Sequence, residues 1–224
     1  MLTMTATRVL SLGDPVYMRV REALRQDIVD GVFPGGTRIK MAELAQRYAV
    51  SAMPVREALQ ELQGEGLVII EPNKGARVRT VDAAFIHNMY DIRGAIDAML
   101  VRRAAAALSA GDLKLLAQSQ SGYEASAKRG ELAAVLAENQ RFHGIINRAA
   151  ANPEAEAMIS RHWSLIDALR GKYGFAKQRL AETVREHRSL LAALEARDVD
   201  AAQRIALGHV EHAKNDLLAC MRGA

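Results

Sequence analysis

Three histidines that could hold a metal ion stand on apolar faces of three different predicted helices. His143 follows Asn139 by four residues, so the two side chains share one helix face. His187 and His209 each continue a stripe of Leu, Ile, Val or Ala residues at helical spacing. Neutral imidazoles that converge on one cation at about 2.0–2.1 Å form a Zn²⁺-type site. One interpretation of the pattern is therefore a divalent metal site at His143, His187 and His209, with Asn139 beside them.

The same histidines have a second interpretation as ordinary core residues. A single His on an apolar helix face is commonly a partly buried side chain with a local hydrogen bond, because burial without a partner costs free energy. Three such positions together with Asn139 favour a shared site, but spacing alone leaves both interpretations open. His87, His162 and His212 lie off the pattern and are interpreted as surface or interhelical residues.

These candidate ligands lie in a region, residues 81–224, that shows no alternating strand pattern. Its apolar periodicity predicts about six helices, at residues 83–108, 112–128, 132–150, 153–171, 177–196 and 199–221. Turn and cap signals separate them, among them Arg129-Gly130 and Asn152-Pro153. Short connections make neighbouring helices antiparallel, so an antiparallel helical bundle is expected.

Residues 15–80 show the pattern of a winged helix-turn-helix, and residues 1–14 are expected to be a flexible arm. Two predicted helices precede Ser51, which is expected to cap a third helix that contains Pro54 in its first turn. A strand at 67–70 and a return strand at 77–79 then predict a hairpin. The fold class is therefore mostly α, with a winged helix before the bundle.

A helix that follows a turn and precedes a basic hairpin is typical of DNA-binding domains. The side chains expected to reach DNA lie at the start of the third helix and at the hairpin turn: Ser51, Met53, Arg56, Asn73, Lys74 and Gly75. The double-stranded DNA partner follows from this local placement. The net charge of +4 over 224 residues does not by itself indicate nucleic acid.

Composition and cysteine content limit the class of protein. Half of the residues are hydrophobic and 4% are aromatic, which suits an Ala- and Leu-rich helical body. Cys220 is the only cysteine, so an intrachain disulfide is impossible, as is usual in the reducing cytoplasm. No stretch approaches the ~20 apolar residues of a membrane span, so we expect a cytoplasmic protein without a membrane partner.

The run DGVFPGGTRIKMAELAQRYAVSAMPVREALQELQGEGLVIIEPNKGARV resembles the N-terminal domain of the GntR family of bacterial transcription regulators. The resemblance implies that Arg56, in the PVRE motif, contacts a base, and that Lys74 and Gly75 form a wing tip that reaches the minor groove. Ala52 stands where the family usually has an arginine that contacts DNA. The departure removes one expected contact.

Residues 82–222 resemble the FCD effector-binding domain of the FadR branch of that family, through Tyr90-Asp91-Ile92-Arg93, Asn139 to His143, Asn152-Pro153, Glu186-His187 and His209. In metal-binding members an Asp stands where this chain has Asn139, and zinc or nickel lines the effector pocket. Asn139 is a weaker ligand because it carries no charge. The resemblance also implies that Arg93 binds the carboxylate of an effector. The alternative for Arg93 is an i,i+4 pair with Asp97 on a solvated face.

The resulting hypothesis is a ligand-responsive repressor of transcription. A homodimer would bind two-fold-related operator DNA, and a small organic acid in the bundle would change that binding. The chain is not expected to be an enzyme. The alternative is a metal-dependent hydrolase, against which Glu186 is expected to point about 100° away from His187 on their helix. A third hypothesis is a constitutive architectural DNA binder, which the polar residues inside the bundle disfavour.

Overall fold

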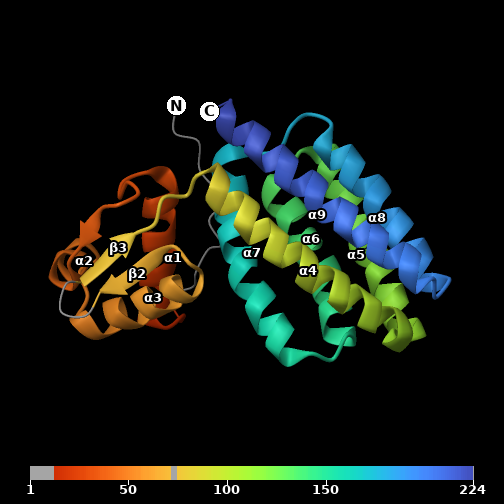
Figure 1. The fold of residues 1–224 in the computed structure, drawn as a ribbon, viewed down its shortest axis with the longest axis horizontal. Coiled ribbons are helices and arrows are strands. Elements are labelled where there is room, and N and C mark those ends of the chain that lie inside the picture. The colour runs from red at the N-terminus through yellow and green to blue at the C-terminus, as the bar shows by residue number, and fades with distance from the viewer. Residues whose placement is uncertain (1–12, 72–74, 224) are drawn as a thin grey trace. The chain divides into compact units, whose positions relative to one another are not determined.

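The computed structural model describes residues 13–71 and 75–223, and the chain divides into two compact units. The first unit runs to Phe85 and includes residues 164–172, and the second contains the remaining helical part. Helices dominate both units, and the strands that are described form one small sheet (Figure 1). The predicted mostly α fold class is confirmed.

Three helices and their apolar faces build the first unit: α1 (Val16–Asp30), α2 (Met41–Arg47) and α3 (Ala52–Gly64). One side chain from each helix, Leu24, Leu44 and Val55, is fully buried in the core between them. Ser51 occupies the predicted N-cap position of α3, but its side chain makes no capping hydrogen bond. The hydroxyl at the start of this helix therefore remains exposed.

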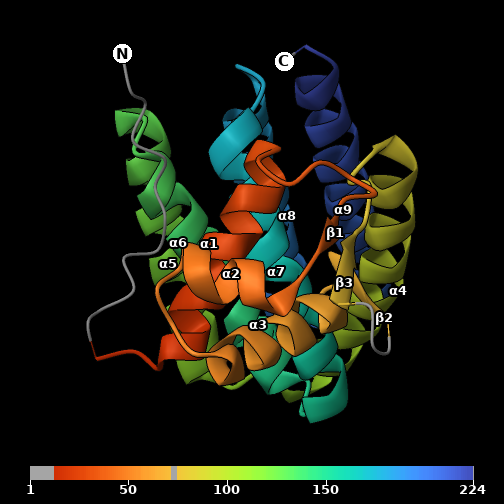
Figure 2. The ribbon, with the colours of Figure 1, turned by 90° about the vertical axis from the view of Figure 1, so that its left-hand side faces the viewer.

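The sheet has three antiparallel strands in the order β1-β3-β2, namely β1 (Arg38–Ile39), β2 (Val68–Glu71) and β3 (Gly75–Val78) (Figure 2). The hairpin of β2 and β3 was expected, whereas β1 was not, because two residues are too few to show alternation. Gly75 has φ 86°, and a Cβ there would lie 2.6 Å from the Ile39 carbonyl oxygen. Glycine is therefore required where β3 approaches β1.

Long helices match the predicted six, and apart from the start of α4 and residues 164–172 of α7 they lie in the second unit. They are α4 (Ala83–Ala107), α5 (Ala110–Arg129), α6 (Leu132–Ala149), α7 (Pro153–Tyr173), α8 (Arg179–Glu195) and α9 (Val199–Arg222). Local sequence sets their ends. Ser109 and Asp112 form a capping box at α5, and Gly130 ends α5 with φ 70°. The side chain of Asp198 caps α9.

A continuous apolar core joins the helices of the second unit. It takes Leu100 from α4, Leu116 from α5, Phe142 from α6, Trp163 from α7, Leu194 from α8 and Ala202 from α9. Within the bundle α5 packs on α6 and α8, and α8 packs on α9. Side chains of α6, α8 and α9 all enter this core, and the inward faces of these helices carry the three predicted histidines. In the described part of the chain, no helix is both long and apolar enough to span a bilayer.

Candidate functional site

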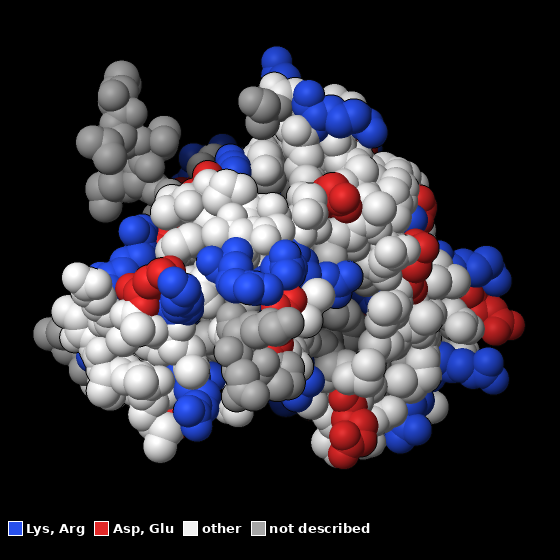
Figure 3. All heavy atoms as spheres, turned by 60° about the vertical axis from the view of Figure 1, so that its left-hand side comes forward, with Lys and Arg blue, Asp and Glu red and all other residues white. Residues whose placement is uncertain are grey.

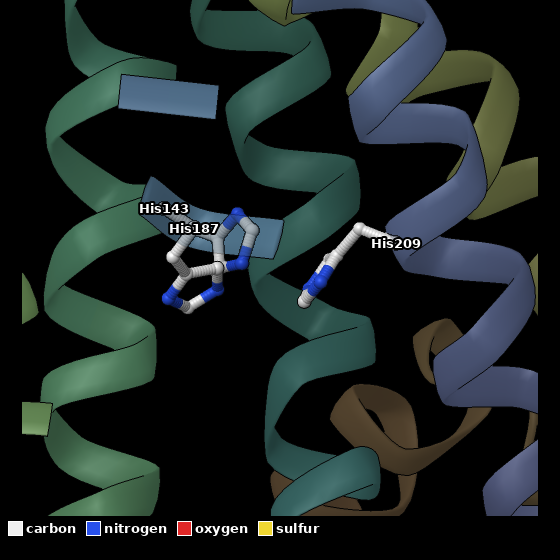
Figure 4. A group of neighbouring side chains, drawn as sticks. All are labelled: His143, His187 and His209. Atoms are coloured by element: carbon white, nitrogen blue, oxygen red, sulfur yellow. The ribbon is translucent and has the colours of Figure 1, made fainter. Parts of the chain in front are cut away.

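The three histidines predicted to share a site do come together. His143 from α6, His187 from α8 and His209 from α9 are 7%, 0% and 5% exposed. Their ring centroids lie 5.0–5.2 Å apart, and one ring nitrogen from each lies within 4.8 Å of those of the others. Figure 4 shows the His209 ring pointing from α9 toward the other two rings. The rings converge instead of packing separately into the core.

Hydrogen bonds from Nδ1 orient two of these rings. His187 Nδ1 lies 3.0 Å from the amide oxygen of Gln120, and His209 Nδ1 lies 2.7 Å from Glu186 Oε2. Amide and carboxylate oxygens accept hydrogen bonds, so each Nδ1 carries the proton and donates it. The Nε2 atom of each ring is then an unprotonated donor of electrons, the form that binds a metal.

Burial keeps the imidazoles neutral. Desolvation lowers the pKa of His143, His187 and His209 below the usual 6.5. For His143, the neighbouring histidines and the Arg93 guanidinium lower the pKa further. The Glu186 carboxylate raises the pKa of His209, but the opposing effect of burial is larger. All three side chains are therefore in the neutral form that metal coordination needs at pH 7.

Two of the ring nitrogens have no hydrogen-bond partner among the described residues. His143 Nε2 and His187 Nε2 are buried and make no hydrogen bond. Nitrogens that ligate one ion at about 2.0–2.1 Å lie up to about 4 Å apart, close to the separation in this structure. The three histidines therefore fit a divalent cation that prefers nitrogen ligands, such as Zn²⁺ or Ni²⁺.

Glu186 contacts this cluster, which the sequence-based prediction missed. It does project away from its neighbour His187, but it meets His209 of the adjacent helix α9. Its carboxylate also receives a two-pronged pair from the buried Arg179, at 2.8 Å for each bond, and a bond from the exposed His212. Burial alone would raise the pKa of Glu186, but the bonds from His209 and Arg179 hold that pKa well below its usual range.

Arg93 and Asp97 form the predicted i,i+4 pair, but not on a solvated face. Arg93 Nε donates to Asp97 Oδ2 at 3.1 Å, and the two residues are 2% and 6% exposed. The Arg93 guanidinium also lies 4.2 Å from the centre of the Trp163 ring. The expectation of a solvated face is therefore wrong. The expectation that Arg93 binds an effector carboxylate stays a prediction.

A cavity of about 10 Å³ borders His143 and His209, and it has about the space of a single water molecule. Its polar lining comes from Asp97, His143, Asn147 and His209. Asn139, one helical turn before His143, is partly exposed and does not line this cavity. Asn147, one turn after His143, was not predicted, because both positions share the face of α6 and sequence spacing could not distinguish them.

The exposed start of α3 presents the residues that were predicted to contact DNA. Ser51, Met53 and Arg56 are all exposed, and Met53 is 65% exposed. Gly75 begins β3, whereas the predicted contacts Asn73 and Lys74 lie outside the described residues. A helix start with exposed polar side chains can enter a DNA groove.

An open groove of about 720 Å³ lies beside this surface, with three basic residues in its lining. It is lined by Arg38, Lys40, Met41, Ala42, Arg56, Leu59, Gln60, Ile70, Glu71 and Gly75. Glu71 pairs at 3.0 Å with Arg38 and with Arg77, while Arg56 has no ion pair in the described ranges. In Figure 3 several Lys and Arg side chains gather in the middle of the face that is drawn. Arg38 escaped prediction because β1 was not recognised.

Two known protein families match this chain, one in its N-terminal part and one in its helical C-terminal part. Residues 16–78 match the family described as bacterial regulatory proteins, gntR family, and residues 88–212 match the FCD domain. Among named relatives, the HTH-type transcriptional repressor RspR of Escherichia coli K12 is 28% identical over 208 residues, covering 93% of this chain and 91% of the relative. The uncharacterized HTH-type transcriptional regulator YdhC of Bacillus subtilis is 26% identical, covering 88% of this chain and 89% of the relative.

A solved structure has the same fold. That of E. coli McbR/YncC superimposes with a TM-score of 0.71 at 22% identity, over 92% of this chain and 98% of the solved one. At this identity the likeness concerns the arrangement of helices and strands alone.

Proposed function

The chain belongs to the GntR family of bacterial regulatory proteins and carries an FCD domain, and from this premise we propose that it is a repressor that releases DNA when it binds a small carboxylate. The DNA-binding domain would span residues 15–80, after the arm at 1–14. The effector-binding and dimerisation domain would span residues 81–224. The regulator would act as a homodimer in the cytoplasm, where bacterial operator DNA lies.

The proposed DNA surface is the start of α3 with the groove beside it. Arg56 supports this proposal most directly, because it is exposed, lines the groove and lacks an intramolecular ion pair among the described residues. A guanidinium with five donors can bind a guanine edge in a bidentate manner. Lys40, also on the groove, is suited to phosphate. Together they could replace the contact that Ala52 does not make.

The observation that carries the sensing part of the proposal is the convergence of three buried imidazoles with two unpartnered Nε2 atoms. We propose that His143, His187 and His209 hold one divalent cation, Zn²⁺ or Ni²⁺, with Asn139 nearby on α6. Gln120 and Glu186 would hold the rings in the ligating tautomer. When bound, the cation would offer a coordination position to an oxygen atom of the effector.

Arg93 would bind the effector's carboxylate. It is buried, it lies against the Trp163 ring, and its charge acts on His143 and His209. A buried guanidinium needs an anionic partner, and in this structure Asp97 provides it. A ligand carboxylate at Arg93 would add a second point of attachment to the cation, so a small acid with an extra oxygen donor would fit best.

Effector binding and DNA binding would be coupled through two arrangements of the helical unit. If the effector weakens DNA binding by some factor, DNA must weaken effector binding by the same factor. A coupling of about 1–3 kcal/mol corresponds to a 5–150-fold change in affinity. Such a change would be enough to switch a promoter over a modest range of effector concentration.

The experiment uses duplex DNA selected by the purified protein from a random library. Fluorescence anisotropy then measures affinity with Zn²⁺ or Ni²⁺ and a panel of small carboxylates. A tight duplex with at least one metal-dependent, carboxylate-dependent loss of affinity supports the proposal. Selection of no duplex would reject the operator-binding role. A tight duplex that no metal or acid affects would reject ligand sensing and favour a constitutive DNA binder.

A further inference from the structure

A cation bound by the three histidines would have no negatively charged ligand among them. Three neutral imidazoles contribute none, and the site already lies close to the buried Arg93 guanidinium. A divalent ion would therefore add two positive charges to a dehydrated region in which the Arg93 charge is balanced by Asp97. Uncompensated charge is costly in such a region, so a carboxylate ligand would strengthen binding of the cation. Asn139, on the same face of α6, is neutral and cannot provide one.

Glu186 contacts the three histidines through His209, but its negative charge is already paired with other groups. Arg179 makes two bonds of 2.8 Å to its carboxylate, and His209 and His212 donate to the same two oxygens. This carboxylate also lies on the Nδ1 side of His209, away from the unprotonated Nε2. Glu186 can therefore orient a ligand, but it does not offset the charge of the cation.

Among the described residues, Asp97 is a second carboxylate near the histidines. It projects from α4, is 6% exposed, and lines the same small cavity as His143 and His209. Its one hydrogen bond within the described structure comes from Arg93 Nε at 3.1 Å. Charge-assisted bonds between nitrogen and oxygen are commonly 2.7–2.9 Å, so this pair is loose for two buried charges. The second oxygen of Asp97, Oδ1, does not take part in the bond with Arg93.

We propose that Asp97 is the carboxylate ligand of the cation held by His143, His187 and His209. The proposal rests on the metal-lined site of the proposed function. A rotation of the Asp97 side chain within the shared cavity would carry its oxygen from Arg93 to the ion. Arg93 would keep its position against Trp163 and become available to an external carboxylate. Metal binding would thereby prepare the anion site, and an acid effector would bind the metal-loaded protein more tightly.

The test is a double-mutant cycle in which metal affinity is measured by calorimetry. Ni²⁺ is titrated into the full-length parent protein, Asp97→Asn, Asn139→Asp and the double variant, in a buffer free of carboxylates. We expect Asp97→Asn to weaken binding by about 10-fold or more, since charge count controls cation affinity. In the Asn139→Asp background, where a second carboxylate is present, the same change should weaken binding by less than about 3-fold.

An equal fold-change in both backgrounds, or none in either, would overturn the proposal, because Asp97 would then only pair with Arg93. In that case the three-histidine site and the proposed function would stand. A parent protein that binds no Ni²⁺, and gains none in the Asn139→Asp variant, would overturn both this inference and the metal-lined pocket.

A measurement on the unaltered protein covers the case in which Asp97→Asn fails to fold. A crystal structure of the Ni²⁺-loaded parent protein should show an Asp97 oxygen about 2.0–2.2 Å from the ion. An ion on the three histidines with Asp97 still bonded to Arg93 would overturn the proposal directly.

Discussion

The carboxylate of Glu186 on α8 accepts a hydrogen bond of 2.7 Å from Nδ1 of His209 on α9. This bond assigns the proton of His209 to Nδ1 and leaves Nε2 for the cluster of three imidazoles. Arg179 donates to both oxygens of the same carboxylate. One partly buried ion pair thus sets both the tautomer and the orientation of a candidate metal ligand.

Replacing Glu186 by Gln should weaken Zn²⁺ or Ni²⁺ binding by about 10-fold, because removal of an outer partner makes the imidazole a poorer and less oriented ligand. Calorimetric titration measures the effect. The matched control is His212→Ala, which removes the exposed donor to the same carboxylate and should change the affinity by less than about 2-fold. Equal affinity of the Glu186→Gln variant and the parent protein would refute the orienting role.

The metal-free protein should lose stability on mild acidification. Burial lowers the pKa of His143, His187 and His209 in the folded state, whereas the unfolded chain titrates near 6.5. Only the unfolded chain then takes up protons as the pH falls below about 6.5. The free energy of unfolding should be level above about pH 7.5 and fall below 6.5, by up to about 1.4 kcal/mol per pH unit for each histidine.

Urea denaturation in the presence of a chelator, between pH 8 and pH 5, measures this slope. A His187→Leu variant should show a smaller slope, because one buried titrating group is gone. A slope that does not change in that variant would attribute the acid sensitivity to other groups.

Arg56→Ala should remove specific DNA binding while the fold persists. Loss of a bidentate base contact costs about 1–3 kcal/mol, or 5–150-fold in affinity for each site of a dimer. Gel shift on a selected duplex measures the effect. Arg129→Ala removes the same charge from an exposed site at the end of α5, and it should leave DNA affinity unchanged. Loss of equal size in both variants would show only a general effect of charge.

Gly75→Ala should destabilise the winged helix more than Gly31→Ala. The two glycines have nearly equal positive φ, 86° and 84°, so the backbone strain of an added Cβ is matched. Only at Gly75 would that Cβ also meet a backbone carbonyl, at 2.6 Å, while nothing lies within 4 Å at Gly31. We expect about 1 kcal/mol at Gly31 and at least about 2 kcal/mol at Gly75. Equal losses in denaturant titrations would contradict the steric argument.

The sequence by itself determined the helices and their inward faces. Apolar periodicity and helix-end signals are local features of the chain, so α6 and α9 begin at the residues that were predicted. For the same reason, the buried sides of α6, α8 and α9 carry the predicted histidines. The strand β1 could not be predicted from local sequence, since its two residues form a strand only by pairing with β3. Arg38, which lies in β1, could not be assigned to the groove for the same reason.

Only the tertiary structure decided which side chains of different helices meet. The position of Glu186 on α8 predicted that it would point away from His187. In the structure, however, the neighbouring helix α9 brings His209 into contact with Glu186. Likewise Asp97 and Asn147 join the cavity, while Asn139 on the same face of α6 does not. Contacts between helices depend on their relative rotation and crossing, which arise from packing of the whole core and leave no local pattern in the chain.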